Sequence, residues 1–141
     1  MKRIVVGVDG SGAAAVAVEW AVELAAQVGA TLHLVSAFEL RYGWIEAYEP
    51  DIEKWRAEAQ RATNAMLDDM VDNVSGPNVE ITRAVVEAPA ARALFDESKD
   101  ADLLVVGSRG LGGFKGLLLG SVSQQCVQHS DCPVVVVPSP A

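Results

Sequence analysis

Residues 102–123 read DLLVVGSRGLGGFKGLLLGSVS, and this stretch decides the fold. It opens with the β-rich run Asp102 to Gly107, whose interior is continuously apolar, as expected of a central parallel strand that is buried on both faces. A glycine-rich loop follows, and Ser121 and Ser123 stand where a helix is expected to begin. A strand that leads through a loop into a helix is typical of a parallel α/β unit.

The rest of the chain repeats this alternation of short β-rich runs and longer helical patterns. The other β-rich runs are Lys2 to Asp9, Ala30 to Phe38, Val79 to Val86 and Pro133 to Pro138. Helical patterns are expected over Ala13 to Val28, over about Asp51 to Val74, after Pro89 and after Gly120. Such alternation predicts βαβ units with right-handed crossovers. We therefore expect one doubly wound α/β domain over residues 1–141, with a five-stranded parallel sheet and helices on both faces, similar to a Rossmann fold.

Local patterns refine this expectation. Gly29 is a predicted helix stop. The third β-rich run alternates apolar and charged residues, which places it at an edge of the sheet. Trp20 is expected in the core, as is a helical stripe of Trp55, Ala59, Ala62, Met66 and Met70.

Composition excludes several classes of protein. The 141 residues are 50% hydrophobic and carry a net charge of -8, which fits a folded domain and disfavours nucleic acid as a partner. No apolar run approaches the length that crosses a bilayer, so no membrane association is expected. Two cysteines make no disulfide framework, and a reducing cytoplasm is the expected location.

In an open α/β sheet, ligands bind beyond the carboxyl ends of the strands, where the winding direction reverses. Two glycine-rich segments leave such ends: residues 7–12 after the first strand and residues 107–123 after the fourth. Glycines let backbone N–H groups close around an anion, and a helix N-terminus adds partial positive charge. Arg109 and Lys115 add local cations. The alternative is a plain surface loop with Ser121 as an ordinary N-cap.

Standard phosphate-binding motifs are missing from the sequence. Lys115 is followed by Gly116 and not by serine or threonine, so the P-loop pattern is broken. The glycines after the first strand fall at 7, 10 and 12, which is not the dinucleotide fingerprint. P-loop NTPases and ordinary dinucleotide-binding enzymes are therefore disfavoured.

The spacing Gly107-x2-Gly110-x9-Gly120-Ser121 resembles that of the nucleotide-binding branch of the universal stress proteins. The resemblance extends to the turn Val8-Asp9-Gly10-Ser11 and to His129–Pro133 before the terminal valines. It implies strand order 3-2-1-4-5 and the binding of ATP or a related adenine nucleotide, with Mg²⁺ carried on the nucleotide.

The resemblance also assigns residues. Asp9 matches an acidic residue beside the nucleoside and phosphates, and Ala37 a small residue packed on adenine. Ala14 departs from the pattern, because many relatives carry serine there. The expected nucleotide-binding residues are Gly7, Val8, Asp9, Ser11, Ala37, Gly107, Ser108, Arg109, Gly110, Leu111, Gly112, Gly113, Gly120, Ser121, Val122 and Ser123.

Catalytic and metal sites are weakly indicated. Cys126, His129 and Cys132 are spaced by three, but no fourth zinc ligand lies near them and a disulfide is not expected in the cytoplasm. His33 lies inside a strand and is more simply a residue of a sheet face than a catalyst. No catalytic residue and no dedicated metal site is predicted, although Asp9 could position Mg²⁺ through the nucleotide.

Three functions remain open at this point. The leading hypothesis is an adenine-nucleotide-binding module for stress response or signalling, with at most slow hydrolysis because no general base is evident. The others are a nucleotide hydrolase with genuine turnover and an interaction module that binds another protein but no nucleotide. A homodimer is expected through the apolar edge strand Val134 to Val137, limited by Pro133 and Pro138. The family resemblance points the same way.

Overall fold

The computed structural model describes residues 1–40, 51–74, 78–109 and 119–139. The strands are β1 (Arg3–Gly7), β2 (Thr31–Phe38), β3 (Ile81–Glu87), β4 (Leu103–Gly107) and β5 (Val134–Val137). The helices are α1 (Gly12–Val28), α3 (Ile52–Val74), α4 (Ala90–Glu97) and α5 (Ser121–His129). The alternation predicted from the sequence is confirmed.

The five strands form one parallel sheet of order β3-β2-β1-β4-β5. The central strand β1 pairs with β2 through Val5 and His33, and with β4 through Val6 and Val105. The order implied by the family resemblance is therefore confirmed. The half-polar β3 lies at one edge, as its alternation predicts, and the valine strand β5 lies at the other.

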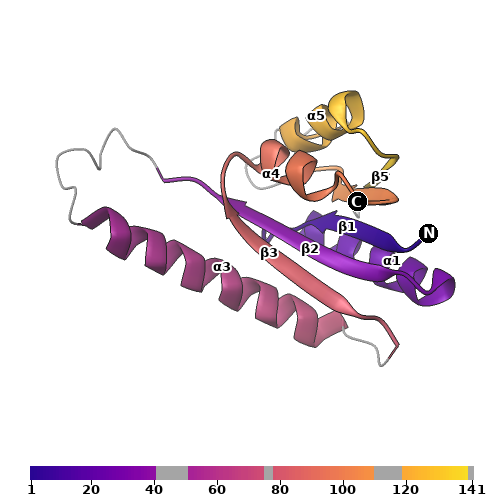
Figure 1. Cartoon of the computed structure of the whole chain (residues 1–141), viewed down its shortest axis with the longest axis horizontal. Coiled ribbons are helices and arrows are strands. Elements are labelled where there is room, and N and C mark those ends of the chain that lie inside the picture. Colours follow the sequence, from indigo (N-terminus) through magenta and orange to yellow (C-terminus); the bar gives the residue numbers. More distant parts are fainter. Residues whose placement is uncertain (41–50, 75–77, 110–118, 140–141) are drawn as a thin grey trace.

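Helices cover both faces of the sheet (Figure 1). Alternate residues of β1 point to opposite faces, so that Ile4 and Val6 pack with α1 and α3, whereas Val5 packs with α4 and α5. Because both faces are buried, the central strands need apolar residues at every position. This explains the continuous apolar runs of β1 and β4.

Helix α1 packs closely on the sheet because its inner face is built from small residues. Ala17, Ala21 and Ala25 recur every fourth position and are fully buried. Gly29 ends the helix with φ of 71°, in the left-handed region that favours glycine, so the predicted stop is confirmed. The core position expected for Trp20 is wrong: its side chain is 38% exposed, since it lies on the flank of the alanine face.

The apolar stripe of α3 also differs from the prediction. Leu67, which the stripe omitted, is the one fully buried side chain, and Met66 and Met70 pack beside it. Ala62 is exposed. The helix lies over the edge of the sheet formed by β2 and β3, where only a narrow strip of its surface can be covered (Figure 1).

No helix in the described ranges combines the length and the apolar character needed to cross a membrane.

Candidate functional site

The turn between β1 and α1 is organised around Asp9. One oxygen of its carboxylate, Oδ1, accepts a hydrogen bond from the backbone N–H of Ser11 at 2.9 Å. Gly10 between them adopts φ of 84°, which a larger residue would resist. The Ser11 hydroxyl in turn accepts from the backbone N–H of Ala14 at 3.1 Å and caps α1. The turn therefore fixes an exposed carboxylate at the carboxyl edge of the sheet.

Ala14, where the sequence was expected to depart from the family pattern, is buried in the first turn of α1. The departure from the family pattern is thus accommodated by packing against the core, while the backbone N–H of this residue is satisfied by Ser11.

The ends of the segment between β4 and α5 are tied together by a hydrogen-bonded latch. The backbone N–H of Gly120 donates to the carbonyl oxygen of Ser108 at 2.6 Å. The Ser123 hydroxyl shares its single hydrogen between the same oxygen and the carbonyl of Gly120, each 3.0 Å from Oγ. Ser123 is only 3% exposed, so within the described residues its hydroxyl holds the loop ends. The expected contact of Ser123 with the nucleotide stays a prediction.

Gly120 is the N-cap of α5, and as a glycine it has no side chain with which to cap the first turn. The interpretation of Ser121 as an ordinary N-cap is therefore wrong. Ser121 is the first helical residue, is exposed, and accepts from Gln125 Nε2 at 3.3 Å. A helix start without a side-chain cap presents N–H groups that an anion can bind.

Glycines bring the two segments together. A Cβ atom on Gly107 would lie 2.9 Å from the backbone carbon and oxygen of Ala13, so glycine lets the first turn of α1 rest against the end of β4. A Cβ on Gly7 would lie 3.0 Å from Leu94 Cδ1, so α4 closes on β1 at the same edge. The Asp9 turn, β4 and α4 therefore converge on the point where the winding reverses.

Other predicted residues are placed less completely. Val8 is buried, and Ala37 lies one residue before the end of β2, on the face covered by α4. Val122 is half-buried in the first turn of α5, and Arg109 is half-buried just after Ser108. Gly110, Leu111, Gly112, Gly113 and the cation Lys115 lie outside the described residues.

Sequence reasoning missed two contacts from α3. Arg56 Nε donates to Glu87 Oε1 at 2.6 Å, and so joins the start of α3 to the carboxyl end of β3. Met66 packs near the Asp9 turn, with its Cγ 3.8 Å from where a Cβ on Gly10 would lie. The Glu53–Arg56 spacing of three signals an ion pair on one helix, but nothing local signals Glu87.

The spaced cysteines and histidine do not converge. Cys126 is fully buried, and burial together with the nearby Cys132 raises the pKa of its thiol to about 11. His129 is exposed in the last turn of α5. Both cysteines are free, and the described residues contain no group of three or more metal-ligating side chains.

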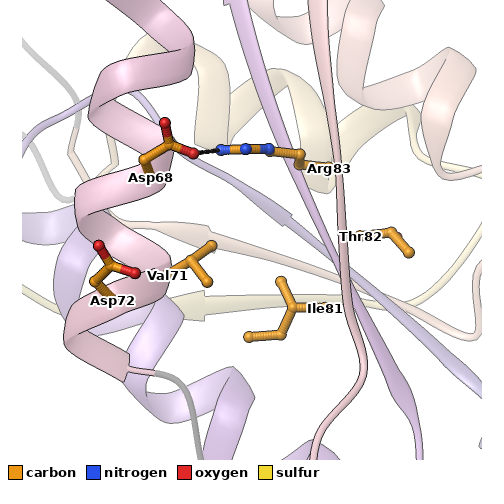
Figure 2. Close-up of a pocket in the computed structure, with 6 residues that line it drawn as sticks. All are labelled: Asp68, Val71, Asp72, Ile81, Thr82 and Arg83. Carbon is orange, nitrogen blue, oxygen red and sulfur yellow. Dashed lines mark ion pairs between the residues drawn. The ribbon is translucent and has the colours of Figure 1, made fainter.

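A surface hollow of about 170 Å³ lies between α3 and β3, away from the glycine segments. It is lined by Asp68, Val71, Asp72, Ile81, Thr82 and Arg83. Figure 2 shows Asp68 and Arg83 paired across its top, with Val71 and Ile81 facing one another and Thr82 turned away. The hollow therefore lies along the contact between α3 and the edge strand β3, and the ion pair of Asp68 with Arg83 spans part of it. It is not part of the candidate site.

Comparison with known proteins gives a consistent picture. The profile of the universal stress protein family matches residues 1–138. Universal stress protein Rv2624c of Mycobacterium tuberculosis is 34% identical over 142 residues, covering 99% of this chain and 49% of that protein. Universal stress protein YxiE of Bacillus subtilis is 29% identical, covering 96% and 98%.

Among solved structures, a universal stress protein in complex with cAMP is 28% identical, with a TM-score of 0.74 and coverage of 99% and 98%. The chain spans about half the length of the mycobacterial relatives that it matches, and nearly the whole of the Bacillus relative.

Proposed function

The chain belongs to the universal stress protein family, and from this premise we propose that it binds an adenine nucleotide, ATP carried with Mg²⁺, in a stress-response or signalling role. The observation that supports this most is the latched loop between β4 and α5. The bond between Gly120 and Ser108 holds the start of α5 near the carboxyl end of β4, and the Asp9 turn follows the carboxyl end of the neighbouring strand β1.

The phosphates would bind at the start of α5. Its first N–H groups and its dipole favour negative charge, and Arg109 adds a cation at the other end of the loop. The protein has a net charge of -8, so an anionic ligand needs a local region of positive charge, and the start of α5 together with Arg109 would provide one. Gly110 to Gly113 would complete the phosphate loop.

The nucleoside would lie on the side of β1 and β2. Gly7 and Val8 line that edge, and Ala37 offers a small apolar surface to adenine. Asp9 fits either of two roles, because its exposed carboxylate can accept from a ribose hydroxyl or ligate Mg²⁺ on the phosphates. Magnesium supplies charge neutralisation of the phosphates when bound. A similar protein that is 28% identical has been solved with cAMP, which supports an adenine ligand.

Hydrolysis is proposed to be slow at most. Within the described part of this edge, Asp9 is the one carboxylate of the turn, and it is engaged with the backbone of Ser11. A nucleotide hydrolase would need a base that positions water. Multiple turnovers per minute would favour the hydrolase alternative, and no nucleotide binding at all would favour an interaction module.

The direct test is calorimetric titration of the purified protein with ATP, with and without Mg²⁺, preceded by mass spectrometry of any ligand released on denaturation. Gly110→Ala is expected to weaken binding about tenfold with the fold retained, because a methyl group obstructs the approach of backbone to phosphate. Unchanged affinity in this variant would argue against the site. Asp9→Ala should weaken binding mainly in the presence of Mg²⁺ if the carboxylate acts through the metal, and equally in both conditions if it contacts ribose.

We also propose a homodimer through β5, in the cytoplasm. Val134, Val135 and Val136 are only half-buried, and β4 is the strand's one partner among the described residues. An apolar sheet edge of this kind is an aggregation hazard unless it is paired, and a two-fold axis pairs it with its own copy. Sedimentation should show a dimer at micromolar concentration, and Val135→Pro should give monomer or aggregate. A monomeric wild-type protein would refute this interface.

A further inference from the structure

A polar group is buried on the face of the sheet that α4 covers. His33 on β2 is 8% exposed, and it is the one ionisable residue among the buried side chains of that strand. Its Nδ1 lies 2.6 Å from the Thr82 hydroxyl on β3. Its Nε2 is buried and has no hydrogen-bond partner in the described residues. The nearest carboxylate oxygen, Glu97 Oε2 on α4, is 3.7 Å from Nε2, too far for a hydrogen bond.

The charges around His33 oppose its protonation in part. In the described part of the chain, Arg3 on β1 and Glu97 on α4 are the charged groups that act on the imidazole, and β3 presents the neutral Thr82. Burial lowers the pKa of His33 below 6.5, Arg3 lowers it further, and Glu97 offsets part of the shift. At neutral pH the ring is therefore uncharged. Protonation would place a second cation near Arg3 with little access to water.

Helix α4 connects this group to the nucleotide edge. Glu97 is in its last turn, and Leu94, one turn earlier, is the residue that closes on Gly7. Because the helix has only 8 residues, a displacement at Glu97 also displaces Leu94. A protonated His33 would draw the Glu97 carboxylate from 3.7 Å to hydrogen-bond distance of Nε2. This movement shifts the last turn of α4 and with it Leu94, which closes the edge at Gly7.

We propose that His33 and Glu97 form a proton-sensitive contact beneath α4, through which protonation of His33 weakens nucleotide binding. The inference rests on the proposed function and adds its regulation. By linkage, nucleotide binding must make His33 harder to protonate by the same factor.

The first test is the affinity for ATP from pH 7.5 to pH 5.5, in the wild type and in His33→Gln, which keeps a polar side chain beside Thr82 but does not titrate. The titration of ATP's own phosphates is common to both proteins and cancels in the ratio of their dissociation constants. We expect this ratio, wild type over variant, to rise about fivefold on acidification. A constant ratio overturns the inference alone. An absence of binding at pH 7.5 overturns the proposed function and the inference with it.

The second test does not depend on whether His33→Gln folds. The chain has only two histidines, so His129→Gln leaves His33 as the single imidazole for proton NMR. We expect the pKa of His33 to be lower with ATP bound than without it, by about half a unit or more. Equal values with and without ATP would overturn the coupling.

Glu97→Gln is the third test, and it changes the partner of His33 on α4. Removing the carboxylate that favours the protonated ring should move the pKa of His33 further down, and the loss of affinity should begin at lower pH. A purely structural role of Glu97 would change the stability of the fold but not the pH at which affinity falls.

Discussion

The two faces of the sheet differ in what they bury. The face under α1 and α3 contains aliphatic and alanine side chains, such as Leu34, Ala21 and Leu67, packed without ionisable groups among its buried members. The face under α4 and α5 buries His33, Cys126 and Ser123 among its valines and leucines. The first face has the composition of a core that only stabilises, whereas the second combines packing with groups that can titrate or hold a loop. This difference suggests that ligand binding and its control act through the second face.

The difference between the two faces is tested most strongly by shortening one buried leucine on each face. Leu34→Ala and Leu94→Ala each remove a buried leucine, one from each face, and each should lower the free energy of unfolding by about 3 kcal/mol in urea denaturation. Only Leu94→Ala should also weaken ATP binding by the folded protein, because Leu94 closes on Gly7. Equal effects of the two variants on affinity would remove the functional distinction between the faces.

Gly107→Ala tests where the first face meets the nucleotide edge. The new methyl group would lie 2.9 Å from the Ala13 backbone, which cannot yield as a side chain can. We expect a loss of about 2 kcal/mol in the free energy of unfolding. Gly12→Ala is the control, because nothing lies within 4 Å of its added Cβ; it should change stability by no more than about 0.5 kcal/mol. A neutral Gly107→Ala would show that the helix can move away freely.

Ser123→Ala sharpens the comparison within the second face. The substitution removes the hydroxyl contacts of the latch and leaves the carbonyl of Ser108 with the Gly120 N–H alone, so unfolding should become easier by about 1 kcal/mol. Calorimetry should show weaker ATP binding as well, since the loop ends are then held by one bond. Ser98→Ala removes another buried hydroxyl on the same face, which bonds only within the end of α4, and should leave affinity intact.

Asp102→Asn should have the smallest effect and should not distinguish the faces. The backbone N–H groups of Lys2 and Arg3 donate to Asp102 Oδ2 at 2.7 and 3.0 Å, and they hold the pKa of this carboxyl below 3.8. A lowered pKa in the folded state gives stability that is present above pH 3.8 and is lost as pH falls through the folded value. The difference in Tm between wild type and variant should therefore shrink in acid, with ATP affinity unchanged at neutral pH. A difference that does not depend on pH would contradict this account.

The fold could be predicted because its strands are buried on both faces. Central strands such as β1 and β4 need continuous apolar runs, and the edge strand β3 needs only one apolar face, so composition identifies β3 as an edge. It does not identify β5, whose four valines lie at the other edge. The order of the strands came from the family resemblance, since no local pattern shows which strands are neighbours. The stripe of α3 was misplaced because a helix at the edge of a sheet buries only a narrow strip, and the sequence does not show which strip of the helix that is: Leu67 is buried and Ala62 is exposed.

The candidate site could be predicted only in outline. Glycine spacing indicates an anion loop, but it does not show that Ser123 is turned inward to Ser108, because that bond joins residues from different elements. The ion pair of Arg56 with Glu87 and the burial of His33 under α4 are equally long-range. Each depends on which helix covers which strand, and that follows from the three-dimensional packing of the chain.

The loop end at Ser108 is also fastened to β5. Its backbone N–H donates to the carbonyl of Val137 at 2.8 Å, and its hydroxyl accepts from the backbone N–H of Ser139 at 3.0 Å. One edge of β5 thus holds the start of the glycine-rich loop, while the other has no strand partner among the described residues and is the edge proposed to join a second copy of the chain. In such a pair, filling one site would strain or relax the shared strands before the second site fills. Nucleotide saturation curves would then be cooperative, with a Hill coefficient that departs from one only while the strands stay joined.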